Sequence, residues 1–262
     1  MRISLFGGGS DLPMYRELTG SGGCVLSCTI DRYVTVKPIV IYSAVLPGSG
    51  LGGSGALHVA STLAAHPYLT RPQLFDQAWQ AETVMNRHAG WQDVAASTYG
   101  GLNLFTFDEE LAVDPIALPP GLDARLLLFG TGITRKASAP LAMQAEQMSI
   151  HIPLLRELTV IAREAATALQ RGNHSYAGAL LHPAWLSKRL FSGVTNERIN
   201  TAYDAARNAG ATGGKLCGAG GGGFLLFYVE PDAQASVRAA MDDLGLRELA
   251  FNLTTDGATI VS

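Results

Sequence analysis

Residues 46–56 read LPGSGLGGSGA, a glycine-rich run that leads directly into the apolar, proline-free segment SGALHVASTLAA at residues 54–65. The second segment predicts a tightly packed helix that begins at about Ser54. A glycine turn at a helix N-terminus aims several backbone N–H groups and the positive end of the helix dipole at one point. The sequence therefore predicts an anion site here, and a nucleotide phosphate is its natural occupant.

Two common phosphate-binding loops can be tested against this spacing. A Walker A loop requires Lys and then Ser or Thr after its last glycine, and this run contains no lysine. A dinucleotide-binding loop requires GxGxxG after a strand and an acidic residue about 20 positions later. Gly48, Gly50 and Gly53 have that spacing, but no suitable Asp or Glu follows in the helix or the next strand. Both alternatives are disfavoured.

The 262 residues, 47% hydrophobic and 16% charged, are enough for one large domain or two smaller ones. We place a boundary near Pro120, which divides residues 1–120 from residues 121–262. The net charge is -3 and the Lys and Arg residues are scattered, so we expect no nucleic-acid partner. No apolar run reaches membrane-spanning length, and we expect no membrane partner.

The cysteines and the first residues bear on the compartment. Three cysteines form neither an even disulfide framework nor a CxxC pair, namely Cys24, Cys28 and Cys217. The opening MRISLFGGG has neither the apolar core nor the cleavage site of a signal peptide. We therefore expect a reducing, cytoplasmic location.

Periodicity predicts a mixture of helices and strands. Residues 24–40 alternate apolar and polar types and predict a strand with a bend near Asp31. Further strands are expected at residues 100–107, 122–133, 223–230 and 246–262. Helices are expected at residues 71–88, 152–171, 176–191, 196–208 and 231–245. The strands are not joined by regular βαβ units, so the sequence predicts the α+β class.

Two more motifs accompany the glycine run: RISLFGGGSDLP at residues 2–13 and GGKLCGAGGGGFLLF at residues 213–227. Together the three motifs resemble those of the GHMP kinases, named for galacto-, homoserine, mevalonate and phosphomevalonate kinases. Residues 2–13 resemble the substrate motif, residues 46–56 the ATP-phosphate loop and residues 213–227 the C-terminal glycine loop. AGWQD, YGGLNLF, TGITRKAS and LLHPAWLSKRL add a similarity to the heptose 7-phosphate kinase and fucokinase-like branch. The resemblance implies an N-terminal S5-like ATP-binding domain and a C-terminal ferredoxin-like domain.

The resemblance also implies the residues that act on ATP. Asp93 in GWQD matches the catalytic aspartate that polarises the attacking hydroxyl, and Arg2 matches the arginine that offsets charge near the transferred phosphoryl group. Glu82 and Ser54 match the Mg²⁺ ligands. A helix N-cap is the alternative for Asp93, and a solvated helix carboxylate is the alternative for Glu82. The ATP phosphates would lie on Pro47, Gly48, Ser49, Gly50, Leu51, Gly52, Gly53 and Ser54.

A sugar or sugar-phosphate substrate is implied by the same resemblance. Its binding residues would be Gly8, Gly9, Ser10, Asp11, Gly220 and Gly221. Arg135 and Lys136 in TGITRKAS would bind a phosphate that the substrate already carries, because guanidinium and ammonium groups suit phosphate. Lys188 and Arg189 are weaker candidates for that role, and ordinary surface charge is the favoured explanation for both.

One departure from the family pattern concerns ATP. Family members carry several dozen more residues between Val40 and Ile41, including part of the adenine pocket. Either the protein lacks that segment, which would put ATP binding in doubt, or the sequence omits a disordered stretch. The intact strand and loop motifs on both sides favour the second explanation. Two alternatives therefore stay open beside an ATP- and Mg²⁺-dependent sugar kinase: an inactive GHMP-like binding or regulatory protein, and a kinase for a non-sugar alcohol. A homodimer is also possible.

Overall fold

A computed structural model of the protein describes residues 1–37, 40–45, 48–133 and 138–261. The first of its larger sheets has the strand order β1-β2-β5-β6, and a last strand, β11, pairs with the end of β2. All of these pairs are antiparallel. The strands are β1 (Arg2–Phe6), β2 (Cys24–Ile30), β5 (Leu102–Phe107), β6 (Leu111–Ile116) and β11 (Leu253–Thr254).

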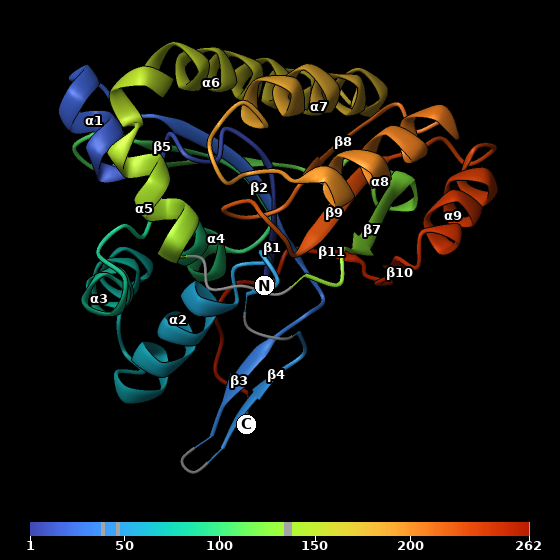
Figure 1. Cartoon of the computed structure of the whole chain (residues 1–262). Helices are drawn as coiled ribbons and strands as arrows, with labels where there is room; N and C mark the ends of the chain where they lie inside the picture. Colours follow the sequence, from blue (N-terminus) through green and yellow to red (C-terminus); the bar gives the residue numbers. More distant parts are fainter. Residues whose placement is uncertain (38–39, 46–47, 134–137, 262) are drawn as a thin grey trace.

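The second sheet has the order β10-β7-β9-β8 and is also antiparallel. Its strands are β7 (Leu126–Gly130), β8 (Gly213–Leu216), β9 (Phe224–Tyr228) and β10 (Arg247–Glu248). Helices α8 (Glu197–Asn208) and α9 (Gln234–Asp243) pack together beside this sheet (Figure 1). The expected boundary near Pro120 falls between β6 and β7, and the division of the chain into two domains stays a proposal.

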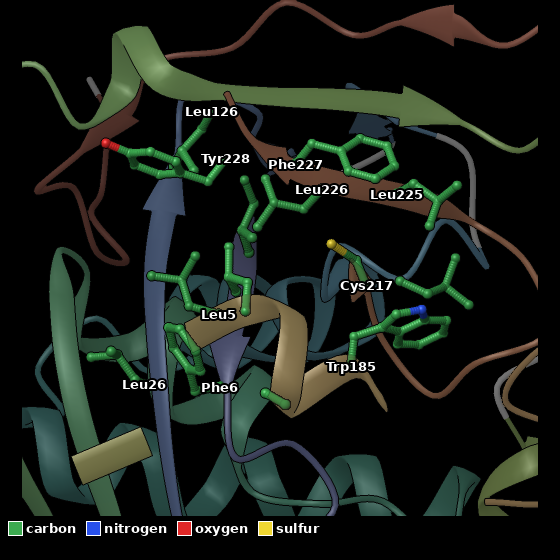
Figure 2. Close-up of a cluster of buried hydrophobic side chains, with 14 of the residues drawn as sticks. Leu5, Phe6, Leu26, Leu126, Trp185, Cys217, Leu225, Leu226, Phe227 and Tyr228 are labelled. Atoms are coloured by element: carbon green, nitrogen blue, oxygen red, sulfur yellow. The ribbon is translucent and has the colours of Figure 1, made fainter. Parts of the chain in front are cut away.

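The two sheets share one hydrophobic core. Helices α6 (Met148–Gln170) and α7 (His174–Lys188) lie side by side across both sheets, α6 against β1 and β2 and α7 against β8 (Figure 1). Figure 2 shows side chains of both sheets around Trp185 of α7, which is 1% exposed. They include Leu5, Phe6 and Leu26 from the first sheet and Leu225, Leu226 and Phe227 from the second.

The other face of β2 and β5 is covered by three helices. Val25 of β2 and Phe105 of β5 point to this side. Cys24 and Leu26, the neighbours of Val25, point to the shared core. Residues in β2 are therefore buried on both faces. The covering helices are α2 (Gly53–Ala65), α3 (Arg71–Met85) and α4 (Gln92–Tyr99). The remaining elements are α1 (Pro13–Thr19), α5 (Ser138–Glu146), η1 (Asp123–Arg125), β3 (Val34–Val36) and β4 (Ile41–Ser43).

Most of the expected elements agree with the structure. The bend near Asp31 separates β2 from β3, and the helix expected at Ser54 begins one residue earlier. Other parts differ from the expectation: no helix was expected where α4 lies, and α9 begins at Gln234 rather than at Pro231. No helix among the described residues is both long and apolar enough to span a membrane.

The Val40–Ile41 junction closes a short hairpin. Val36 pairs with Ile41, and Lys37 and Val40 exchange backbone hydrogen bonds of 2.9 and 3.2 Å. The β3–β4 hairpin projects from the body of the molecule (Figure 1).

Backbone contact joins the two glycine loops. A Cβ atom at Gly50 would lie 2.5 Å from the carbonyl oxygen of Cys217, and one at Gly218 would lie 2.6 Å from the Cα of Gly50. A Cβ at Gly223 would lie 2.4 Å from the carbonyl oxygen of Ser49. Only glycine allows this approach. The loop before α2 and the loop after β8 are thereby held against each other.

We predict that Gly218→Ala destabilises the protein much more than Gly20→Ala. Both glycines have positive φ, 77° and 69°, but Gly20 has open space around its Cα. The φ strain alone should cost about 1–2 kcal/mol in both variants. Overlap with Gly50 should add about 1–3 kcal/mol to Gly218→Ala. Urea unfolding measures both free energies, and equal losses would contradict the backbone contact.

Candidate active site

A cavity of about 530 Å³ lies where the two glycine loops meet. It is lined by the segment that follows β1, the loop before α2, the end of α3, the start of α4 and the loop after β8. Single residues of α5 and α7 complete its wall. Among the side chains that line it are Arg2, Asp11, Ser54, Glu82, Gln92, Asp93, Gln144 and Lys188.

Arg2 and Asp93 form an ion pair in this cavity. The Arg2 Nε donates to Asp93 Oδ1 at 2.9 Å, and its Nη2 contacts the same oxygen. The Arg2 Nη1 donates to the Gly50 carbonyl at 2.8 Å, and its backbone N–H donates to the Leu51 carbonyl at 3.1 Å. Arg2 is 1% exposed, so its charge is buried beside one carboxylate. The N-cap alternative for Asp93 is wrong, because Trp91 is the N-cap of α4.

Asp11 is buried at the start of α4. It accepts hydrogen bonds from the backbone N–H groups of Gly9, at 2.9 Å, and Gln92, at 3.2 Å. The Gln92 side-chain amide donates a third, at 3.2 Å. Burial raises the pKa of Asp11, while these hydrogen bonds lower it. A Cβ at Gly90 would lie 2.0 Å from Asp11 Oδ2, so a glycine is required there. Asp11 therefore fixes the helix that carries Asp93.

Glu82 is a buried carboxylate with an open coordination site. It is 5% exposed, and its Oε2 has no hydrogen-bond partner among the described residues. The pKa of Glu82 is raised to about 7. Burial is the main cause, nearby Asp93 acts in the same direction, and the Ser54 hydroxyl opposes both. The solvated-carboxylate alternative is therefore wrong. Mg²⁺ prefers a few protein oxygens together with phosphate oxygens, and Glu82 with Ser54 fits that requirement.

The loop before α2 presents its backbone to the cavity. Gly48, Ser49, Gly50, Gly52, Gly53 and Ser54 line the cavity. Gly52 is the N-cap of α2 with φ 73°, and within the described residues no side-chain cap hydrogen bond reaches the first N–H groups of this helix. These groups are suited to an anion. Leu51 instead places its side chain in the core, and Pro47 lies outside the described residues.

The predicted substrate residues do not all reach the cavity. Gly8, Gly9 and Asp11 line it. Ser10 does not, because its hydroxyl is buried within hydrogen-bond distance of the Gly7 and Cys24 carbonyls, at 2.8 and 3.1 Å.

The C-terminal glycines lie elsewhere than expected, and the predicted role of the basic pair stays a prediction. Gly220 and Gly221 pack against Val194, and this loop instead lines the cavity with Gly218 and Ala219, two residues earlier. Arg135 and Lys136 lie outside the described residues.

Sequence reasoning undervalued Lys188 and overlooked Gln144. Lys188 is 8% exposed and lines the cavity, so the surface-charge explanation is wrong for it. A signal was available, because Leu181, Ala184, Trp185 and Lys188 have the i, i+3, i+4, i+7 spacing of a buried helix face. Gln144 gave no such signal, since its place depends on how α5 packs.

Known proteins resemble the chain over most of its length. Residues 20–101 match the GHMP kinases N terminal domain, and residues 165–245 match GHMP kinases C terminal. A D-glycero-alpha-D-manno-heptose 7-phosphate kinase from Campylobacter jejuni is 30% identical over 247 residues, which cover 87% of this chain and 73% of the relative. An L-fucokinase/L-fucose-1-P guanylyltransferase from Bacteroides fragilis is 31% identical over 76% of this chain and 23% of that protein.

A solved structure agrees in fold. The crystal structure of a D-glycero-D-manno-heptose 1-phosphate kinase from Bacteroides thetaiotaomicron has a TM-score of 0.74 at 20% identity, covering 100% of this chain and 98% of that one. The chain belongs to the GHMP kinases, ATP-dependent phosphotransferases that act on hydroxyl groups. The predicted family and its α+β fold are confirmed.

We predict that Glu82→Gln stabilises the protein without nucleotide, and more so as the pH rises. The folded protein holds the Glu82 proton up to about pH 7, whereas the unfolded chain releases it near the ordinary glutamate pKa of 4.5. Ionisation of Glu82 therefore costs stability as the pH rises between these values. The gain in Tm should be larger at about pH 8 than at about pH 5. Asp76→Asn, on the exposed face of α3, is the control and should show no such trend. A Tm difference for Glu82→Gln that is independent of pH would contradict the burial of this charge.

Proposed function

We propose that the protein is an ATP-dependent sugar kinase that phosphorylates the anomeric hydroxyl of a heptose 7-phosphate or a related sugar, for nucleotide-sugar synthesis. The observation that carries the proposal is the ion pair between buried Arg2 and partly exposed Asp93, in the cavity that the loop before α2 and the segment after β1 line. The 30% identity to a heptose 7-phosphate kinase supports this choice of acceptor.

Asp93 would orient the acceptor hydroxyl and take its proton as the hydroxyl attacks. Phosphoryl transfer passes through a loose transition state, so the position of this carboxylate matters more than its basicity. Arg2 fixes Asp93 through its Nε at 2.9 Å and brings positive charge close to the transferred group. The same guanidinium is tied to Gly50, so donor loop and base keep one geometry.

The uncapped start of α2 would bind the ATP phosphates through backbone N–H groups. Glu82 and Ser54 would hold Mg²⁺, which neutralises phosphate charge when it is bound. Gly8, Gly9 and Asp11 would bind the acceptor, because they line the same cavity as the Arg2–Asp93 pair.

Location and assembly are proposed on narrower grounds. Cys24, Cys28 and Cys217 are free and buried, which suits a reducing compartment such as the cytoplasm. A homodimer remains a proposal.

We predict that the wild-type protein releases ADP from Mg-ATP with one member of a panel of heptose 7-phosphate, fucose, galactose and mevalonate. Asp93→Asn should lower kcat by at least about 100-fold because it removes the proton acceptor. ATP should still raise the Tm of this variant, since Asp93 does not form the phosphate loop.

Asp114→Asn provides the matched control, because Asp114 is exposed on β6 and undergoes the same chemical change. Unchanged turnover in Asp93→Asn would remove Asp93 from the mechanism. Turnover with mevalonate alone would favour a non-sugar alcohol as the acceptor. No turnover and no ATP-induced shift in Tm would favour the inactive binding protein.

A further inference from the structure

Lys188 ends α7 with its ammonium group inside the cavity. Its Nζ donates to Gln144 Oε1 at 3.1 Å and lies 4.3 Å from the centre of the Phe191 ring. A Cβ at Gly9 would lie 2.7 Å from this nitrogen. The ammonium group therefore touches the backbone of the segment that the sugar would contact, and only glycine leaves it this space.

No carboxylate pairs with this cation in the part of the chain that the structure describes. The ion pairs found there are made by four arginines, Arg2, Arg32, Arg125 and Arg238. An ammonium group has three N–H donors, and the described residues provide one acceptor for Lys188. A buried charge without a counter-charge is costly, so a structural role gives no reason to keep it.

A second lysine strengthens the positive field. Lys215 of β8 is also buried, and its Nζ donates to the Ser4 carbonyl at 2.6 Å. The pKa of Lys188 is lowered to about 7. Burial is the main cause, Lys215 acts in the same direction, and Asp11 opposes both. Burial, and after it the charge of nearby Lys188, lowers the pKa of His151 in α6. Apart from Asp11, the titratable groups around Lys188 are thus cationic or neutral.

Gln144 fixes the direction of this ammonium group. Its Oε1 accepts from Lys188, and its Nε2 donates to the Ala219 carbonyl at 2.7 Å. The amide therefore joins α5, α7 and the loop after β8 on one side of the cavity. The close approach of this ammonium group to Gly9, which the proposed function assigns to the acceptor, places Lys188 with the acceptor.

We propose that Lys188 is a specificity-determining residue that binds an anionic group carried by the acceptor, a phosphate monoester, away from the hydroxyl that is attacked. This inference rests on the proposed function and names the residue that selects a phosphorylated sugar over a neutral one. Arg135 and Lys136 were the candidates for this role in the sequence. Lys188 is a further candidate, and its side chain lines the cavity.

Binding of a phosphorylated acceptor by Lys188 should depend on pH. Only the ammonium form attracts a phosphate, and in the free protein this form is lost as the pH rises through about 7. The bound phosphate stabilises the ammonium form, so binding above this pH takes up a proton. The KM for a phosphorylated acceptor should therefore increase at alkaline pH, and the KM for a neutral acceptor should not.

The experiment compares D-glycero-D-manno-heptose 7-phosphate with the unphosphorylated heptose in the wild type, Lys188→Met and Arg189→Gln. Methionine keeps the apolar stem and removes the charge. Arg189 is half-buried at the next position, and the described cavity wall does not include it, so Arg189→Gln is the matched control. Lys188→Met should raise the KM for the heptose phosphate about 10- to 100-fold, the range for a hydrogen bond to a charged group. The KM for ATP and for the neutral heptose should stay unchanged.

Three outcomes separate the inference from the proposed function. Wild-type turnover with an unchanged preference in Lys188→Met overturns the role of Lys188, and an increase confined to the KM for ATP assigns Lys188 to the nucleotide instead. No wild-type turnover with either heptose contradicts the proposed acceptor. If Lys188→Met does not fold, calorimetry on the wild type decides: heptose 7-phosphate binding at about pH 8 should take up close to one proton per site, and no uptake would overturn the inference.

Discussion

The buried guanidinium of Arg2 is the constraint on which the rest of the site depends. It is 1% exposed and binds the Asp93 carboxylate and the Gly50 carbonyl, while its own backbone belongs to β1. One side chain thus sets the distance between the acceptor segment, the base and the phosphate loop. A buried cation that loses its partner costs several kcal/mol, about 3–5 in measured cases, so none of the three parts can move alone.

Some charged groups of the cavity are paired within the protein, and others are not. Asp93 is neutralised by Arg2, whereas Glu82 and Lys188 are buried without a counter-charge among the described residues. Their pKa values move in opposite directions, the carboxyl upward and the ammonium downward, because burial disfavours either charge. Each can regain its charge from a ligand of opposite sign: a cation at Glu82 and an anion at Lys188. Such unpaired groups are typical of a site that is completed by its ligands.

The sequence predicted the features that depend on neighbours along the chain. The glycine loop before α2, Asp93 and Glu82 reach the cavity as expected, because short motifs fix their local geometry. The sequence also predicted cavity positions for Ser10, Gly220 and Gly221, which the structure does not show. The direction of a loop residue depends on what packs behind it. The start of α4 was missed for the same reason. Its first turn is capped by Asp11, which is 81 residues away in the sequence.

The most direct test of the account is a crystal structure of the Asp93→Asn protein with Mg²⁺, a non-hydrolysable ATP analogue and the acceptor that the kinetic panel identifies. The terminal phosphate should lie against the backbone of residues 48–54. The metal should lie between Glu82 and Ser54, and the attacked hydroxyl should lie between the terminal phosphate and residue 93. A nucleotide whose phosphates lie outside this loop, or an acceptor hydroxyl far from residue 93, would contradict this arrangement.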